Sequence, residues 1–145
     1  MSKPFSPELY ADNDNAKELI IKWLNTDDEN HAYVNPDQYG IDVICDTADE
    51  RRYFYEVEVK HNWNGSKFPF STVHFPKRKL KFANKDSIFA MLNHQRTHVL
   101  LISGQQFLDA SIVRKDTVYT RNEEFIEITV DDCKIVELGE SIDKC

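Results

Sequence analysis

The chain has 145 residues, of which 41% are hydrophobic and 30% are charged, and its formal net charge at pH 7 is -7. This is the length of one ordinary domain, so we expect a single domain over residues 1–145, with residues 1–12 as a loosely ordered arm. The chain has 4 glycines and 5 prolines, which excludes collagen-like and low-complexity proteins. No apolar run approaches the roughly 20 residues of a membrane span, so no membrane partner is expected.

The three cysteines, Cys45, Cys133 and Cys145, are odd in number and lack CxxC spacing. Their pattern argues against a disulfide framework and against a structural zinc site, and it fits a reducing compartment. The first seven residues lack the apolar stretch of a secretory signal. We therefore expect a cytoplasmic protein.

An amphipathic helix is predicted over residues 13–25. Its apolar side chains recur at the i, i+3, i+4 spacing of one helix face: Ala16, Leu19, Ile20, Trp23 and Leu24. Trp23 lies within this stripe, so we expect it in the core.

Two strands joined as a hairpin are predicted next, over residues 41–46 and 53–60. Both segments alternate apolar and polar residues with the period of a strand. Residues 48–52 between them are polar and predict a five-residue loop. In the second strand the odd-numbered positions are apolar, whereas the even-numbered positions from 56 to 60 are charged.

The second half of the chain is predicted to contain mostly strands. We expect a short strand at 72–75, a short helix from Pro76 to about residue 83, strands at 88–92 and 98–102, a helix at 104–113, and a terminal hairpin of 125–130 with 134–138. This order predicts an α/β (α+β) fold with a central mixed β-sheet flanked by helices.

Positive charge is concentrated in residues 60–85. This segment has seven lysine and arginine residues and no acidic residue, so all 25 acidic residues lie elsewhere. Aromatic residues interleave with it: Trp63, Phe68, Phe70, Phe75 and Phe82. Cations alternating with rings suit a groove that binds backbone phosphates and stacks bases, and Trp63 is a candidate for such stacking. An ordinary solvated surface with some rings in the core has the same pattern, so both interpretations stay open.

The start of the short helix is the favoured place for phosphate contacts, because the amides of a helix N-terminus favour an anion. The candidate nucleic-acid-binding residues are Lys67, His74, Lys77, Arg78, Lys79 and Lys81. A surface helix with ordinary charges explains these residues equally well.

The predicted hairpin brings acidic residues together. A five-residue loop puts Asp42 opposite Glu58, within about 5.5 Å, and Glu56 and Lys60 project from the same face. Opposed like charges destabilise a strand pair unless something neutralises them, and a divalent cation would do so. Mg²⁺ is typically held by one or two carboxylates plus substrate phosphate, so the cluster suits metal-dependent phosphodiester chemistry. The competing interpretation is the ordinary wet face of a sheet.

Gly40-Ile41-Asp42, followed by Glu56-Val57-Glu58-Val59-Lys60, resembles the motif of the PD-(D/E)XK nuclease superfamily. That superfamily includes type II restriction enzymes, archaeal Holliday-junction resolvases and many phage nucleases. The resemblance covers residues 13–103 and implies the restriction-endonuclease-like fold with Mg²⁺- or Mn²⁺-dependent hydrolysis. Carried over by position, Asp42 and Glu58 are metal ligands, the backbone carbonyl of Val59 is a third ligand, and Lys60 is the catalytic lysine.

The positions of the acidic residues in this chain differ from the family pattern. The literal Pro-Asp pair is Pro36-Asp37, which lies in a turn, so Asp37 is a weaker alternative to Asp42. Many members place a glutamate of the first helix near the metal, and Glu18 is the candidate here. At about 100° per residue, however, Glu18 points away from the apolar stripe and toward solvent.

Glu56 is the alternative to Glu58 as the second ligand. It shares the same strand face, but it lacks the two-residue step to Lys60. We therefore rank Glu56 second, either as a ligand or as an outer partner of the site.

These features predict a small metal-dependent nuclease acting on DNA, in a bacterial or phage-infected cell, with a homodimer as one possible state. The alternative is a catalytically inactive nucleic-acid-binding or protein-interaction module on the same fold. The sequence leaves endonuclease and exonuclease activity equally open.

Overall fold

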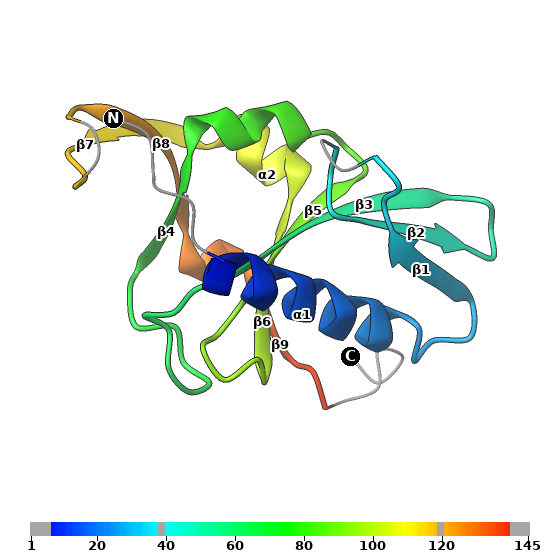
Figure 1. The fold of residues 1–145 in the computed structure, drawn as a ribbon. Coiled ribbons are helices and arrows are strands. Elements are labelled where there is room, and N and C mark those ends of the chain that lie inside the picture. The colour runs from blue at the N-terminus through cyan, green and yellow to red at the C-terminus, as the bar shows by residue number, and fades with distance from the viewer. Residues whose placement is uncertain (1–6, 38–39, 119–120, 140–145) are drawn as a thin grey trace.

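The protein is an α+β fold of a six-stranded mixed sheet and a three-stranded sheet (Figure 1). The computed structural model describes residues 7–37, 40–118 and 121–139. The larger sheet has the order β1-β2-β3-β5-β6-β9 and consists of Asn30–Val34, Val43–Thr47, Arg52–Val59, Ser87–Leu92, His98–Ser103 and Lys134–Glu137. The smaller sheet has the order β4-β8-β7 and consists of Thr72–Pro76, Glu123–Thr129 and Ser111–Lys115. The helical segments of the described residues are α1 (Pro7–Leu24), α2 (Gly104–Asp109) and the 3₁₀ helices η1 (Lys77–Phe82) and η2 (Val130–Asp132). None of these described helices is both long and apolar enough to cross a membrane.

Helix α1 packs on one face of the larger sheet. It begins at Pro7, so the expectation of a loose arm is wrong for residues 7–12, while residues 1–6 lie outside the described part of the chain. Proline suits the first turn because its missing N–H would have no partner there. The stripe predicted from the periodicity is confirmed, since its most buried side chains are Ala16, Ile20, Trp23 and Leu24.

Strands β1, β2 and β3 form an antiparallel meander, and β3 then pairs in parallel with β5. The strands predicted at 41–46, 53–60, 88–92 and 98–102 correspond to β2, β3, β5 and β6. A parallel pair requires a crossover, and β4 with η1 supplies it. Strand β1 escapes the sequence pattern because Ala32 is its one buried residue.

The expected terminal hairpin is wrong. Strand β8 lies between β4 and β7, whereas β9 pairs with β6 at the edge of the larger sheet. The 3₁₀ turn η2 separates them, so the chain leaves one sheet and enters the other between consecutive strands. The helix expected at 104–113 also ends early, at Asp109, and is followed directly by β7.

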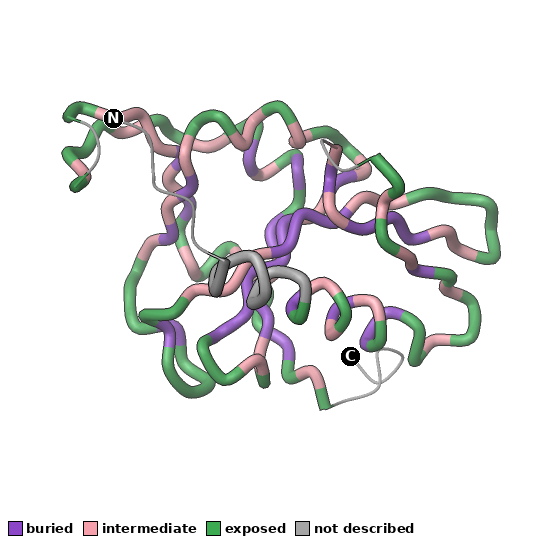
Figure 2. Tube along the Cα trace, viewed as in Figure 1, coloured by how far each residue is buried: buried purple, intermediate pink, exposed green. Residues whose placement is uncertain are grey.

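The central strands of the larger sheet, β3, β5 and β6, are covered on both faces. Residues of α1 and the odd-numbered residues Tyr55 and Val57 of β3 form one core cluster. On the opposite face, β5 and β6 pack against the smaller sheet and α2, where the rings of Phe89 and Phe107 stack with their centroids 3.8 Å apart. Figure 2 shows these buried segments converging at the centre of the molecule. The layer opposite α1 is thus mainly a sheet, where flanking helices were expected.

Gly104 begins α2 at a position without room for a side chain. A Cβ there would lie 2.1 Å from the Asn84 carbonyl oxygen and 2.1 Å from Ser87 Oγ. The Asn84 carbonyl accepts the Ser87 N–H at 3.2 Å, so it cannot move without disturbing the entry to β5. We expect Gly104→Ala to lower the free energy of unfolding by about 1–3 kcal/mol, measured by urea denaturation. Gly139→Ala is the control, since no atom of the described residues lies within 4 Å of its added Cβ; equal midpoints for the two variants would contradict this account.

Candidate functional site

The turn between β2 and β3 decides which acids face each other. Residues 48–50 form a three-residue loop, closed by the Thr47 N–H donating to Arg51 O at 2.9 Å and by Glu50 in the left-handed region at φ 66°. This is a hairpin type in which one residue takes positive φ. The loop is shorter than the five residues expected, and Val43 consequently pairs with Tyr55. Continuing this register brings Asp42 level with Glu56, so the expected opposition of Asp42 and Glu58 is wrong by two residues.

Asp42 stands immediately before β2 and is held by two neighbours. Its Oδ2 accepts the backbone N–H of Val57 at 2.8 Å, which fixes the carboxylate against β3. Its Oδ1 lies 3.4 Å from Lys17 Nζ of α1. The side chain of Asp42 is 17% exposed, so this ion pair is partly screened by solvent.

Glu56 is the buried acid of the site, with 8% of its surface exposed. Burial raises the pKa of its carboxyl group to about 8, with a further contribution from the adjoining carboxylate of Asp42 and an opposing one from Lys79. Lys79 Nζ of η1 lies 3.5 Å from Glu56 Oε1. Among the described residues the buried Oε2 of Glu56 meets no nitrogen donor, and the carboxyl groups of Glu56 and Asp42 are hydrogen-bonded to each other. The centre of the cluster is therefore an acid pair, Asp42 with Glu56, and not Asp42 with Glu58.

The alternation predicted for β3 is confirmed, since its even-numbered and odd-numbered side chains lie on opposite faces of the sheet. Glu56 and Glu58 line one narrow crevice together with Lys79 and the ring of Phe89. At about 3.3 Å of rise per residue, Lys60 lies about 13 Å along the strand from Glu56. The lysine beside Glu56 is thus Lys79, whereas Lys60 lines a separate cleft. The role of the Val59 carbonyl stays a prediction.

Two of the alternative acids lie away from this pair. Glu18 is exposed on α1, as its helical angle predicted, and its neighbour Lys17 is the α1 residue that reaches Asp42. Asp37 is exposed in the turn before β2, where its carbonyl accepts the N–H of Gly40 at 3.1 Å. Asp42 is therefore more buried than Asp37, which agrees with the choice of Asp42 as the candidate ligand.

The donor set of the acid pair fits a hard divalent cation. Mg²⁺ accepts one or two carboxylates and completes its shell with water and substrate oxygens. Among the described residues Glu56 Oε2 is a buried oxygen, Asp42 Oδ1 lies 3.4 Å from Lys17 Nζ, and the two carboxyl groups are hydrogen-bonded to each other. Within residues 15–37, 40–118 and 121–139, no group of three or more His, Cys, Asp or Glu side chains could hold a metal. The pair thus suits an ion that keeps several waters, and not a closed structural site.

The basic segment is less available to phosphates than its sequence suggests. Lys77 lies 3.4 Å from Glu124, and Arg78 lies 3.8 Å from Glu123. Both glutamates belong to β8, which pairs with β4 directly before η1. Of the remaining candidates Lys79 pairs with Glu56, Lys67 and Lys81 are exposed, and His74 is half-buried. The helix within this segment is the six-residue 3₁₀ helix η1, so the segment lacks the α-helical N-terminus on which the phosphate prediction relied.

Most rings of the basic segment belong to the core. Trp63 is 0% exposed, so its expected stacking on a base is wrong, and Phe68 and Phe75 are buried as well. Phe70 is the exception, with 50% of its surface exposed. It borders the cleft that Lys60 lines, between the end of β3 and the smaller sheet. The sequence missed the far wall of this cleft, because Lys115 and Phe125 reach it through strand pairings that local patterns do not reveal.

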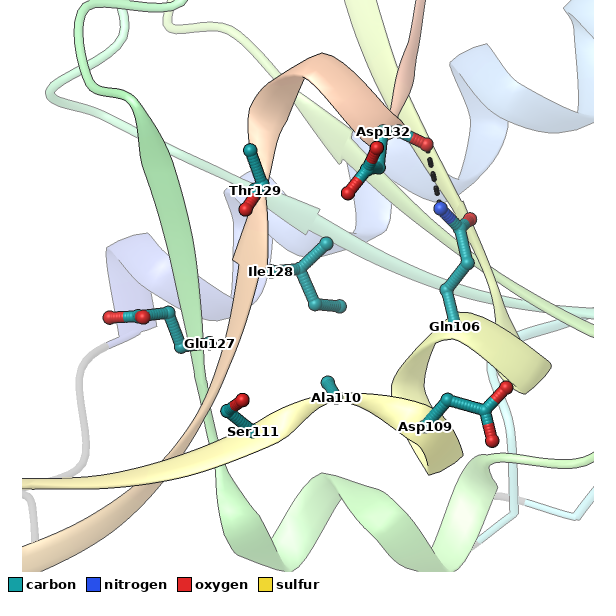
Figure 3. A pocket seen from close by; sticks show the side chains of 8 residues that line it. All are labelled: Gln106, Asp109, Ala110, Ser111, Glu127, Ile128, Thr129 and Asp132. Atoms are coloured by element: carbon teal, nitrogen blue, oxygen red, sulfur yellow. Dashed lines mark hydrogen bonds between the residues drawn. The ribbon is translucent and has the colours of Figure 1, made fainter.

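A second hollow, of about 500 Å³, lies beside α2, β7 and η2 (Figure 3). Its lining includes Asp109, Asp132 and Glu127. In Figure 3 the Glu127 carboxylate points out of the hollow, past β4, where it meets His74 at 2.9 Å. Negative charge here disfavours phosphate, so this face is unsuited to nucleic acid.

No family model, curated protein or solved structure matches this chain. The functional argument therefore depends on the geometry of the site.

Proposed function

We propose that the protein is a Mg²⁺- or Mn²⁺-dependent nuclease that hydrolyses phosphodiester bonds in DNA. The observation that carries the proposal is the acid pair of the half-buried Asp42 and the buried Glu56, aligned across a β-hairpin and accompanied by a lysine. The order of α1, the β1–β3 meander and a crossover to the parallel strand β5 supports a restriction-endonuclease-like core. The three-stranded sheet that covers the other face is an addition to that core.

Each residue of the site has a role that follows from its contacts. Asp42 and Glu56 would hold the cation, which when bound polarises the scissile phosphate and lowers the pKa of a bound water. The Val57 N–H orients the Asp42 carboxylate. Lys79, already 3.5 Å from Glu56, supplies positive charge beside the phosphate as negative charge develops on it. When no cation is present, Lys17 pairs with Asp42, and Lys79 lies beside Glu56, whose carboxyl group keeps its proton up to about pH 8.

Cleavage of DNA by the purified protein tests the proposal. Single-stranded, duplex and branched DNA should be cut with Mg²⁺ or Mn²⁺ and remain intact in EDTA. Either metal should also raise the midpoint of thermal unfolding without DNA, because a ligand bound only to the native state stabilises it. Intact DNA of all three kinds, together with an unchanged midpoint, would contradict the proposal.

The alternative is a binding module without catalysis, and one observation favours it. Lys17 contacts Asp42, and Lys79 contacts Glu56, so the protein can balance the negative charge of the acids without a metal. Such a module would bind DNA with a strong salt dependence and would show no effect of metal on binding or stability.

A further inference from the structure

A cleft of about 310 Å³ opens at the end of β3, between the larger and the smaller sheet. Lys60 lies on one side, and Lys115 of β7, His74 of β4 and Phe125 of β8 lie on the other. Phe70 belongs to the same lining. The cleft therefore combines two lysines with three phenylalanine rings, since Phe68 also lines it, on the strand face that carries the acid pair.

The far wall of the cleft is a hydrogen-bonded chain. Lys115 Nζ lies 3.4 Å from His74 Nδ1, and His74 Nε2 lies 2.9 Å from Glu127 Oε2. An ammonium group can only donate, so Nδ1 is the acceptor, and Nε2 carries the proton that Glu127 accepts. This order holds Lys115 at the cleft and turns Glu127 toward His74. The ammonium group of Lys115 is thus held at the cleft, beside His74.

The rings supply the second half of the site. Phe70 is 50% exposed, and it is held edge-on by the buried ring of Phe68 with their centroids 5.8 Å apart. Phe125 lies under Lys115, whose Nζ is 5.4 Å from the ring centroid. A fixed, exposed ring beside lysines is the arrangement with which single-stranded nucleic acids are bound, because bases stack on the ring and the cations contact the backbone.

We propose that this cleft binds one unpaired nucleotide of the DNA strand, with Lys60 and Lys115 contacting its phosphates and Phe70 stacking on its base. The assignment of the strand as DNA rests on the proposed function. A base inside a duplex is stacked on both faces and cannot reach the ring, so the cleft selects single-stranded or frayed DNA. The nucleic-acid path then runs from the acid pair along β3 into the cleft, and not over η1, where β8 glutamates pair with Lys77 and Arg78.

Binding measured in EDTA tests this inference apart from cleavage. A fluorescent oligothymidylate and a duplex of matched length are titrated against the protein at several salt concentrations. Phe70→Leu is expected to weaken single-strand binding about tenfold through lost stacking, without changing the salt dependence. Lys115→Met should reduce the slope of log K against log salt by about 0.7, the value of one lost phosphate contact. Lys134→Met, on the exposed strand β9, is the charge-matched control and should behave as the unmodified protein does.

The outcomes separate this inference from the proposed function. If Phe70→Leu binds the single strand unchanged, or weakens single strand and duplex equally, the cleft does not select an unpaired nucleotide. If thymidine monophosphate displaces the oligonucleotide at comparable concentration, the ligand is a free nucleotide and the strand assignment is overturned. Loss of binding in Phe70→Leu and Lys115→Met by a protein that never cleaves DNA would support the cleft and reject the nuclease.

Discussion

Glu56→Gln is expected to reduce metal-dependent DNA cleavage by at least about a hundredfold while the protein stays folded. Glutamine keeps the shape of the side chain but replaces one carboxylate oxygen by an amide nitrogen and removes the negative charge. A cation beside Asp42 then lacks its second carboxylate ligand. Asp42→Asn should have a similar effect, and both variants should lose the rise in melting midpoint that Mn²⁺ gives. Initial cleavage rates on one DNA substrate and thermal melts with and without Mn²⁺ measure the two effects separately.

Glu58→Gln is the matched control, because Glu58 lies two residues farther along the same strand face. The motif resemblance names Glu58 as the ligand, whereas the hairpin register names Glu56. We therefore expect Glu58→Gln to lose less activity than Glu56→Gln and to keep most of the metal-induced stabilisation. The opposite order would mean that the motif, and not the register, identifies the ligand. Glu18→Gln, on the exposed side of α1, should change neither quantity.

The difference between motif and register shows which features of the site the sequence can predict. The alternation of β3 follows from a period of two, which a single segment displays, so the charged face of Glu56, Glu58 and Lys60 is predictable. Register depends on the turn, and one residue with positive φ, Glu50, shortens the loop from five residues to three. Polar residues 48–52 carry no pattern that fixes this length. The fold class and the acidic face could thus be predicted, but the pairing of the acids could not.

Contacts between segments that are distant in the chain are the second feature that the sequence does not predict. Strands β8 and β9 read as a hairpin because both are short, amphipathic and separated by two aspartates. Their true partners, β4 and β6, are distant in the chain, and only the packing of the two sheets selects them. This pairing has two consequences for function: it brings β8 glutamates against the cations of η1, and it brings Phe125 to the cleft.

The acid pair also makes the stability of the metal-free protein depend on pH. The pKa of Glu56 is about 8 in the folded protein and 4.5 as an unperturbed carboxyl group. Between these values the folded state holds a proton that the unfolded state has lost, so the contribution of Glu56 to stability is greatest below pH 4.5 and falls as pH rises toward 8. The slope contributed by this one group reaches about 1.4 kcal/mol per pH unit. Glu56→Gln cannot ionise, so in EDTA it should be the more stable protein at pH 8.

Urea denaturation of both proteins in EDTA, from pH 5 to pH 9, measures this difference directly. Taking the difference between the two proteins cancels the other titrating groups and leaves the contribution of Glu56. Lys79→Met should steepen the loss toward high pH, because Lys79 lowers the pKa of Glu56 and its removal leaves the buried charge uncompensated. Parallel profiles for the unmodified protein and Glu56→Gln would mean that the carboxyl group is solvated and that the acid pair is not buried.

Repeating the denaturation with Mn²⁺ connects stability to function. A cation between Asp42 and Glu56 favours the ionised carboxylates, so it should restore at pH 8 the stability that ionisation removes. The binding-module alternative expects the same decline with or without metal, since Lys17 and Lys79 then accompany the acids in place of a metal. A metal ligand is expected to destabilise the metal-free fold when it ionises and to be stabilised again by Mn²⁺. An ordinary surface acid would respond to neither pH nor metal in this way.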